Sequence, residues 1–236
     1  MRSRLLVLLA GYKFKGLIMI NAFISHFKKI SIFIYKVAIS VAVTTLVATS
    51  VQAAQTIVIY GDSLSAAYGI QQSEGWVTLL QNKLTQQNLD YKVVNAGISG
   101  DTTQDGLNRL DRLTVESIDI FVLALGANDM LRGVSPQVMF TNLQQIIDKI
   151  KDKNPKVSLL LLGMELPVWV PGERAAAYRN VFRRLVANYD VAFVPFLLEG
   201  VVGVKRLNMV DGVHPLAEGY QIIAETVWME LKLLLK

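Results

Sequence analysis

The chain has 236 residues, of which 52% are hydrophobic and 18% are charged, and it carries a formal net charge of +5 and no cysteine. The absence of cysteine excludes a disulfide framework, a cysteine-ligated zinc or iron–sulfur site, and a cysteine nucleophile. The two histidines, His26 and His214, are too few for a metal site built from several histidines. The sequence therefore implies neither a cofactor nor a metal ion.

The positive charge is concentrated at the amino-terminal end. Residues 1–53 hold seven lysines and arginines and no acidic residue, whereas the other 183 residues hold 17 cations and 19 acids. The excess of positive charge therefore does not belong to the folded part, and it gives no support for nucleic-acid binding.

Residues 1–53 have the pattern of a secretory signal peptide. An apolar run at 37–47 follows three lysines, and the segment ends at Val51-Gln52-Ala53, where small or short residues occupy the positions that a signal peptidase inspects. We predict cleavage near Ala53 and export, most simply to the periplasm. The alternative is an anchor that is not cleaved, because residues 30–47 are long enough to span a bilayer if Lys36 reaches the interface.

Residues 54–236 are expected to form a single domain of alternating strands and helices. Strands are predicted where short runs are almost continuously apolar, at 56–60, 92–95, 118–125, 157–162 and 191–194. Helical patterns cover 75–87, 103–113, 136–153, 173–188 and 216–235. Strands that are apolar on both faces and alternate with helices indicate a parallel α/β sandwich.

Four polar loops that contain glycine follow predicted strands or precede the last helix, where parallel sheets form their sites. They are Gly61-Asp62-Ser63-Leu64-Ser65, Ala96-Gly97-Ile98-Ser99-Gly100-Asp101-Thr102, Gly126-Ala127-Asn128-Asp129 and Asp211-Gly212-Val213-His214-Pro215. Each loop alone is typical of an ordinary turn or a helix cap. The combination is informative, because it supplies a nucleophile, a base, an orienting carboxylate and hydrogen-bond donors in one protein.

Ser63 is the candidate nucleophile, and a serine needs an adjacent base to become reactive. His214 is the one histidine outside residues 1–53. Asp211 lies three residues earlier across a glycine turn, where its carboxylate can hold the imidazole so that Nε2 faces Ser63. The Ser63 N–H, the Gly100 N–H and the Asn128 side-chain amide are the candidate oxyanion donors. This pattern predicts an acyl-transfer site.

Three other carboxylates in these loops, Asp62, Asp101 and Asp129, are expected to be structural. They can accept hydrogen bonds from loop N–H groups or cap helices, and Asp101 is expected to cap the helix that begins at Thr103.

The four blocks resemble those of the GDSL-type SGNH hydrolases, which are named for the residues that stand here at Ser63, Gly100, Asn128 and His214. The resemblance implies a three-layer α/β/α sandwich with a five-stranded parallel, flavodoxin-like sheet. It also implies a catalytic triad of Ser63, Asp211 and His214 and hydrolysis of acyl esters and thioesters through a covalent acyl-enzyme.

Residues 59–68, 131–133 and 166–167 resemble more specifically the periplasmic thioesterase I, lysophospholipase and arylesterase subgroup. This resemblance implies that the segments around Asn128 and after residue 165 border an acyl groove. The apolar residues expected to line it are Leu64, Met130, Leu166, Pro167, Val168 and Trp169. Met130 departs from the sequence pattern of this subgroup, since close relatives often have glycine there. Its larger side chain is expected to affect the width of the groove.

Other functions share part of this pattern. A flavodoxin-like binder could use residues 61–65 as a phosphate loop, but the Gly-x-Gly-x-x-Gly and Gly-Lys-Ser/Thr motifs are absent from the sequence. An α/β-hydrolase would need Gly-x-Ser-x-Gly, which is also absent. A noncatalytic lipid- or glycan-binding relative and a carbohydrate acetylesterase of the same fold stay as alternatives. The expected partner is a small-molecule or lipid substrate that carries an acyl ester or thioester. The protein is expected to be a monomer and to contact a membrane surface transiently.

Overall fold

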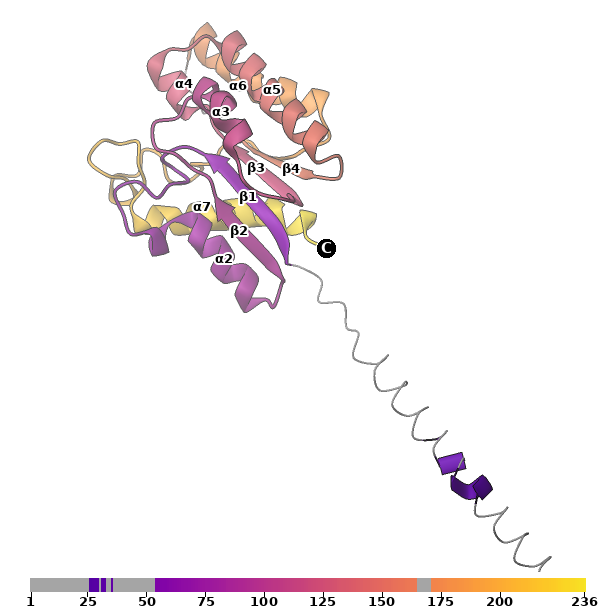
Figure 1. The fold of residues 1–236 in the computed structure, drawn as a ribbon. Helices are drawn as coiled ribbons and strands as arrows, with labels where there is room; N and C mark the ends of the chain where they lie inside the picture. Colours follow the sequence, from indigo (N-terminus) through magenta and orange to yellow (C-terminus); the bar gives the residue numbers. More distant parts are fainter. Residues whose placement is uncertain (1–25, 30, 33–34, 36–53, 165–170) are drawn as a thin grey trace, which may run out of the picture. The chain divides into compact units, whose positions relative to one another are not determined.

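The computed structural model describes residues 26–29, 31–32, 35, 54–164 and 171–236 (Figure 1). Its contacts divide the chain into two units, Met1–Ala53 and Ala54–Lys236. Over the ranges that are described, none of the helices combines the length and hydropathy of a membrane span. The predicted cleavage site lies outside the described residues, so the signal peptide stays a prediction.

Five parallel strands form the centre of the second unit, in the order β2-β1-β3-β4-β5. Their bounds are β1 (Gln55–Gly61), β2 (Tyr91–Asn95), β3 (Ile120–Ala124), β4 (Ser158–Leu162) and β5 (Ala192–Val194). The strands form because their side chains are apolar on both faces, and residues 57–60 of β1 are completely buried. This order confirms the predicted flavodoxin-like sheet.

Helices cover both faces of the sheet, which confirms the predicted three-layer sandwich (Figure 1). One face carries α2 (Trp76–Gln86) and α7 (Ala217–Leu231), which contact each other. The other face carries α3 (Thr103–Arg109), α5 (Pro136–Lys153) and α6 (Glu173–Asn188). The helix predicted at 103–113 is shorter than expected, because a 3-10 turn, η2 (Leu110–Arg112), replaces its last part. Further 3-10 turns are η1 (Gln72–Glu74), η3 (Lys205–Leu207) and η4 (Lys232–Leu234).

The strand order reverses between β1 and β3, and this reversal positions the site. The helix that follows β1 covers one face of the sheet, whereas α5, which follows β3, covers the other. The loops after β1 and β3 therefore separate at the carboxyl edge and leave a crevice between them. The short helix α4 (Ala127–Arg132) begins in this crevice, where the sequence indicated a loop or a helix cap and no helix was predicted.

Candidate active site

The hydroxyl of Ser63 and the imidazole of His214 meet at the carboxyl end of the sheet. His214 Nε2 lies 2.9 Å from Ser63 Oγ, although the two residues are 151 positions apart in the sequence. His214 Nδ1 lies 2.7 Å from Asp211 Oδ2. The three side chains singled out from the sequence therefore form one continuous chain of hydrogen bonds.

Asp211 is held by the turn that it begins. Its Oδ1 accepts hydrogen bonds from the N–H groups of Val213 at 2.9 Å and His214 at 3.1 Å. Gly212 makes the turn possible, because its φ of +70° is strained for other residues. The hydrogen bond from the His214 side chain, assisted by the two backbone bonds, lowers the pKa of Asp211 to about 2. The carboxylate is therefore ionised at neutral pH and can stabilise a positively charged imidazole.

A tight turn after β1 presents Ser63. The Asp62 carbonyl accepts a hydrogen bond from the Ser65 N–H at 3.1 Å, and Asp62 Oδ1 accepts one from the Leu64 N–H at 3.0 Å. Gly61 has no room for a side chain, because a Cβ would lie 2.3 Å from Ser65 Oγ. Asp62 is 1% exposed, and this burial raises the pKa of its carboxyl to about 6. Its carboxylate accepts a loop N–H, as expected from the sequence.

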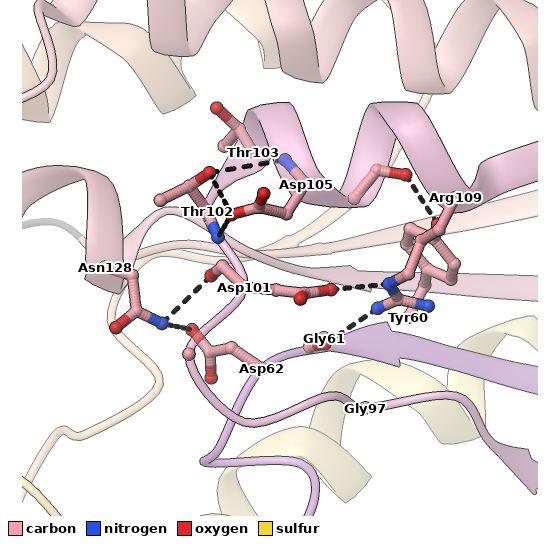
Figure 2. Close-up of polar contacts among 12 residues, drawn as sticks. Tyr60, Gly61, Asp62, Gly97, Asp101, Thr102, Thr103, Asp105, Arg109 and Asn128 are labelled. Atoms are coloured by element: carbon pink, nitrogen blue, oxygen red, sulfur yellow. Dashed lines mark hydrogen bonds and ion pairs between the residues drawn. The ribbon is translucent and has the colours of Figure 1, made fainter.

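Asn128, the second residue of α4, points its amide between two loops (Figure 2). Its Nδ2 donates to the Asp101 carbonyl at 2.9 Å and to Asp62 Oδ2 at 3.3 Å. The first bond has ordinary length, whereas the second is long and therefore weak. The hydrogen that faces Asp62 is thus the one that an oxyanion in the crevice could attract.

Gly100 lies in the loop after β2, one residue before the carbonyl that binds Asn128. It adopts a φ of +89°, which favours glycine, and its own carbonyl accepts a hydrogen bond from Arg132 Nη2 at 2.8 Å. The structure thus brings the loops of Gly100, Asn128 and Ser63 together, as predicted for the oxyanion donors.

A cavity of about 370 Å³ opens beside Ser63. Its walls include Asn128 and His214 and two of the predicted groove residues, Leu64 and Met130. The other lining residues are Ala127, Leu131, Met164, Phe196, Leu198, Val202, Gly212 and Val213. The remaining predicted groove residues, Leu166, Pro167, Val168 and Trp169, lie outside the described residues. The cavity has the size and apolar character typical of a small-ligand site.

Met164 and Phe196 line this cavity but were not singled out from the sequence. They follow β4 and β5, and an isolated antiparallel bridge joins them. The rule that sites form beyond the carboxyl ends of parallel strands also applies to these two strands. Applied to them, it would have indicated both residues.

Of the other loop carboxylates, Asp129 has the structural role expected of it. It is completely buried and accepts hydrogen bonds from the Thr103 N–H at 2.8 Å and the Thr103 hydroxyl at 2.5 Å. The expectation that Asp101 caps α3 was wrong, because Thr102 caps this helix by exchanging hydrogen bonds with Asp105 at 3.0 and 3.3 Å. Within the described part of the chain, no three acidic or histidine side chains are grouped as metal ligands.

Comparison with known proteins agrees with this geometry. Residues 59–222 match the GDSL-like Lipase/Acylhydrolase family. The chain belongs to this family.

Two relatives and one solved structure show where this SGNH hydrolase stands within the family. It is 43% identical over 188 residues to the esterase TesA of Pseudomonas aeruginosa, and the aligned residues cover 79% of this chain and 92% of that protein. It is 37% identical over 182 residues to the thioesterase 1/protease 1/lysophospholipase L1 of Escherichia coli K12, with coverage of 77% and 84%. The crystal structure of the psychrotrophic esterase EstA from Pseudoalteromonas sp., inhibited by monoethylphosphonate, superimposes with a TM-score of 0.69 and 32% identity, over 75% of this chain and 97% of that one. The chain is therefore an SGNH hydrolase of the esterase and thioesterase type.

Proposed function

We propose that this protein hydrolyses acyl esters and thioesters through a covalent acyl-enzyme on Ser63. The supporting observation is the hydrogen-bonded chain from Asp211 through His214 to Ser63 Oγ, at 2.7 and 2.9 Å, in the wall of an apolar cavity. Ser63 Oγ attacks the acyl carbonyl carbon while His214 Nε2 takes the hydroxyl proton. The ionised Asp211 stabilises the imidazolium that results.

The carbonyl oxygen becomes an oxyanion as the bond to Ser63 forms. The backbone N–H groups of Ser63 and Gly100 and the side-chain amide of Asn128 are the proposed donors to this oxyanion. When the tetrahedral intermediate collapses, the bond to the alcohol or thiol breaks, and His214 gives its proton to that leaving group. A water molecule then attacks the acyl-enzyme with His214 as base, and this second cycle releases the carboxylic acid and restores Ser63.

The walls of the cavity favour an apolar acyl group. Apart from the site residues, they are formed mainly by side chains such as Leu131, Met164 and Phe196. An acetyl group would contact few of these apolar walls, so the cavity favours longer acyl groups over acetate. Acyl thioesters, lysophospholipids and aryl esters are the candidate substrate classes, and the name of the Escherichia coli relative supports the first two.

Covalent labelling tests the proposed function. A fluorophosphonate probe should label the purified protein, and peptide mapping should find the label on Ser63, because a serine activated by an adjacent base attacks this phosphorus centre whereas an ordinary serine is a poor nucleophile. Ser65→Ala, in the same turn, is the matched control and should be labelled like the wild type. The absence of both labelling and ester hydrolysis would instead support a noncatalytic lipid- or glycan-binding protein.

Met164 is expected to limit the length of the acyl chain. It is 8% exposed and lines the cavity, so Met164→Ala should lengthen the space for substrate. Each additional buried methylene contributes about 0.8 kcal/mol, and we expect kcat/KM for long-chain p-nitrophenyl esters to rise about fourfold or more relative to the acetate ester. Met229→Ala, at a residue that is 56% exposed on α7, is the control. An unchanged chain-length profile in Met164→Ala would show that this residue does not line the acyl path.

Export and contact with lipid are also part of the proposal. The cationic, acid-free character of residues 1–53 supports export, and the protein recovered from a periplasmic fraction should begin at Ala54. A longer amino terminus would indicate an uncleaved anchor.

Leu131 and Val202 border the cavity with 65% and 40% of their surfaces exposed, which suits a monomer that touches a lipid surface while it takes up substrate. Sedimentation with phospholipid vesicles tests that contact.

A further inference from the structure

Arg109, the last residue of α3, joins the end of β1 to the loop that follows β2 (Figure 2). Its Nε donates to Asp101 Oδ2 at 2.5 Å, and its Nη2 donates to the Gly61 carbonyl at 3.1 Å. The guanidinium carbon also lies 4.1 Å from the centre of the Tyr60 ring. The Tyr60 hydroxyl in turn donates to the Gly106 carbonyl at 2.6 Å, which fixes the ring against α3. The Arg109 side chain is therefore held by the Asp101 carboxylate, the Gly61 carbonyl and the face of the Tyr60 ring.

Both hydrogen-bond partners of Arg109 are close in sequence to groups of the proposed site. Gly61 is two residues before Ser63. Asp101 binds Arg109 with its side chain, and its backbone carbonyl accepts the 2.9 Å hydrogen bond from Asn128 Nδ2. Arg109 thus holds Asp101, and Asp101 holds the amide that we propose as an oxyanion donor.

The ion pair between Arg109 and Asp101 is largely shielded from water. Their side chains are 15% and 12% exposed. Such a pair is weak support for a role in stability, because the loss of hydration offsets much of the attraction between the charges. Its geometry is more informative, since the planar guanidinium presents donors in fixed directions that a lysine cannot reproduce.

We propose that Arg109 is a positioning residue for the oxyanion site, acting through Asp101 and Asn128 without touching a reacting atom. This inference rests on the proposed function. Oxyanion donors act on charge that develops in the transition state, so a displaced Asn128 amide should leave substrate binding intact. The effect of changing Arg109 should therefore appear in kcat and leave KM almost unchanged.

A double-mutant cycle on a p-nitrophenyl ester tests this coupling. Arg109→Lys keeps the positive charge but loses the planar guanidinium and its fixed donors, and kcat should fall about tenfold to a hundredfold. Asn128→Ala alone should lower kcat about 100- to 1,000-fold. In the combined variant, Arg109→Lys should cost no more than about a further twofold, because an amide that is absent cannot be displaced.

The matched control is Arg112→Lys, an exposed arginine in η2 that should keep the wild-type kcat. An equal fall from Arg109→Lys with and without Asn128 would overturn the proposal, and so would an unchanged kcat in Arg109→Lys. Thermal unfolding shows whether Arg109→Lys folds. If it does not, Asp101→Asn takes its place in the cycle, because this change weakens the ion pair but keeps the backbone carbonyl that binds Asn128. The outcomes given for Arg109→Lys then support or overturn the proposal in the same way. A wild-type protein that is inactive and unlabelled would instead contradict the proposed function itself.

Discussion

Ser63→Ala is expected to lower kcat on p-nitrophenyl esters by about a hundred-thousandfold to a millionfold. The Ser63 hydroxyl is the only group in the hydrogen-bonded chain that can form the acyl-enzyme, and the alanine variant must rely on direct attack by water. KM should change little, because the cavity walls and the Asn128 amide are left in place. Steady-state kinetics with a chromogenic ester measures the loss, and pre-steady-state kinetics with substrate in excess should show no burst of product.

The partner of Ser63 supplies the control for this prediction. His214→Ala should cost about as much as Ser63→Ala, and the double variant should be no slower than either, since nucleophile and base act as one unit. Ser65→Ala, two residues away in the same turn, should retain activity. If the losses from Ser63→Ala and His214→Ala multiplied in the double variant, the two side chains would act separately, and their 2.9 Å contact would not be catalytic.

The sheet and the main site were predictable from the sequence because their signals are local. A strand that is covered on both faces, such as β1, is a nearly continuous apolar run, and the polar loop after each strand marks the edge where sites form. The helix α4 was missed because its six residues are too few to show a helical period. It is bounded by Gly126 at a φ of +124° and Gly133 at +71°, and the same glycines suggested a loop.

The surroundings of the site could not be predicted, because they depend on contacts between distant segments. Arg109 reaches a carbonyl 48 residues away, and Asn128 approaches a carboxylate 66 residues away. Nothing in the residues next to Arg109 distinguishes it from a solvent-exposed cation at the end of a helix, where cations are favoured anyway. The wrong expectation that Asp101 caps α3 has the same origin, since only the fold shows that Thr102 caps this helix and that Asp101 is paired with Arg109.

Asp211→Asn is expected to lower kcat about a thousandfold to ten-thousandfold. The asparagine can keep the turn, because its side-chain oxygen can still accept the Val213 and His214 N–H groups. It cannot stabilise an imidazolium, and its amide can favour the tautomer of His214 that does not present a free Nε2 to Ser63. Asp152→Asn, at an exposed position on α5, is the matched control and should change kcat little.

The pKa of Asp211 also predicts how this loss depends on pH. Hydrogen bonding from His214 lowers the pKa to about 2, below the usual value of 3.8, so the carboxylate is ionised at every pH at which an esterase is assayed. Protonation of Asp211 should therefore contribute nothing to the pH dependence of this loss between about pH 5 and 9. The stability that the ionised carboxylate contributes is present above its unfolded pKa and is lost as the pH falls through about 2. Asp211→Asn should therefore be slightly less stable than the wild type at pH 7, and this difference should shrink as the pH falls through about 2. The difference at pH 7 should be small, because the side chain is 44% exposed. A kcat ratio below about ten at neutral pH would mean that the 2.7 Å contact with His214 is not needed for turnover.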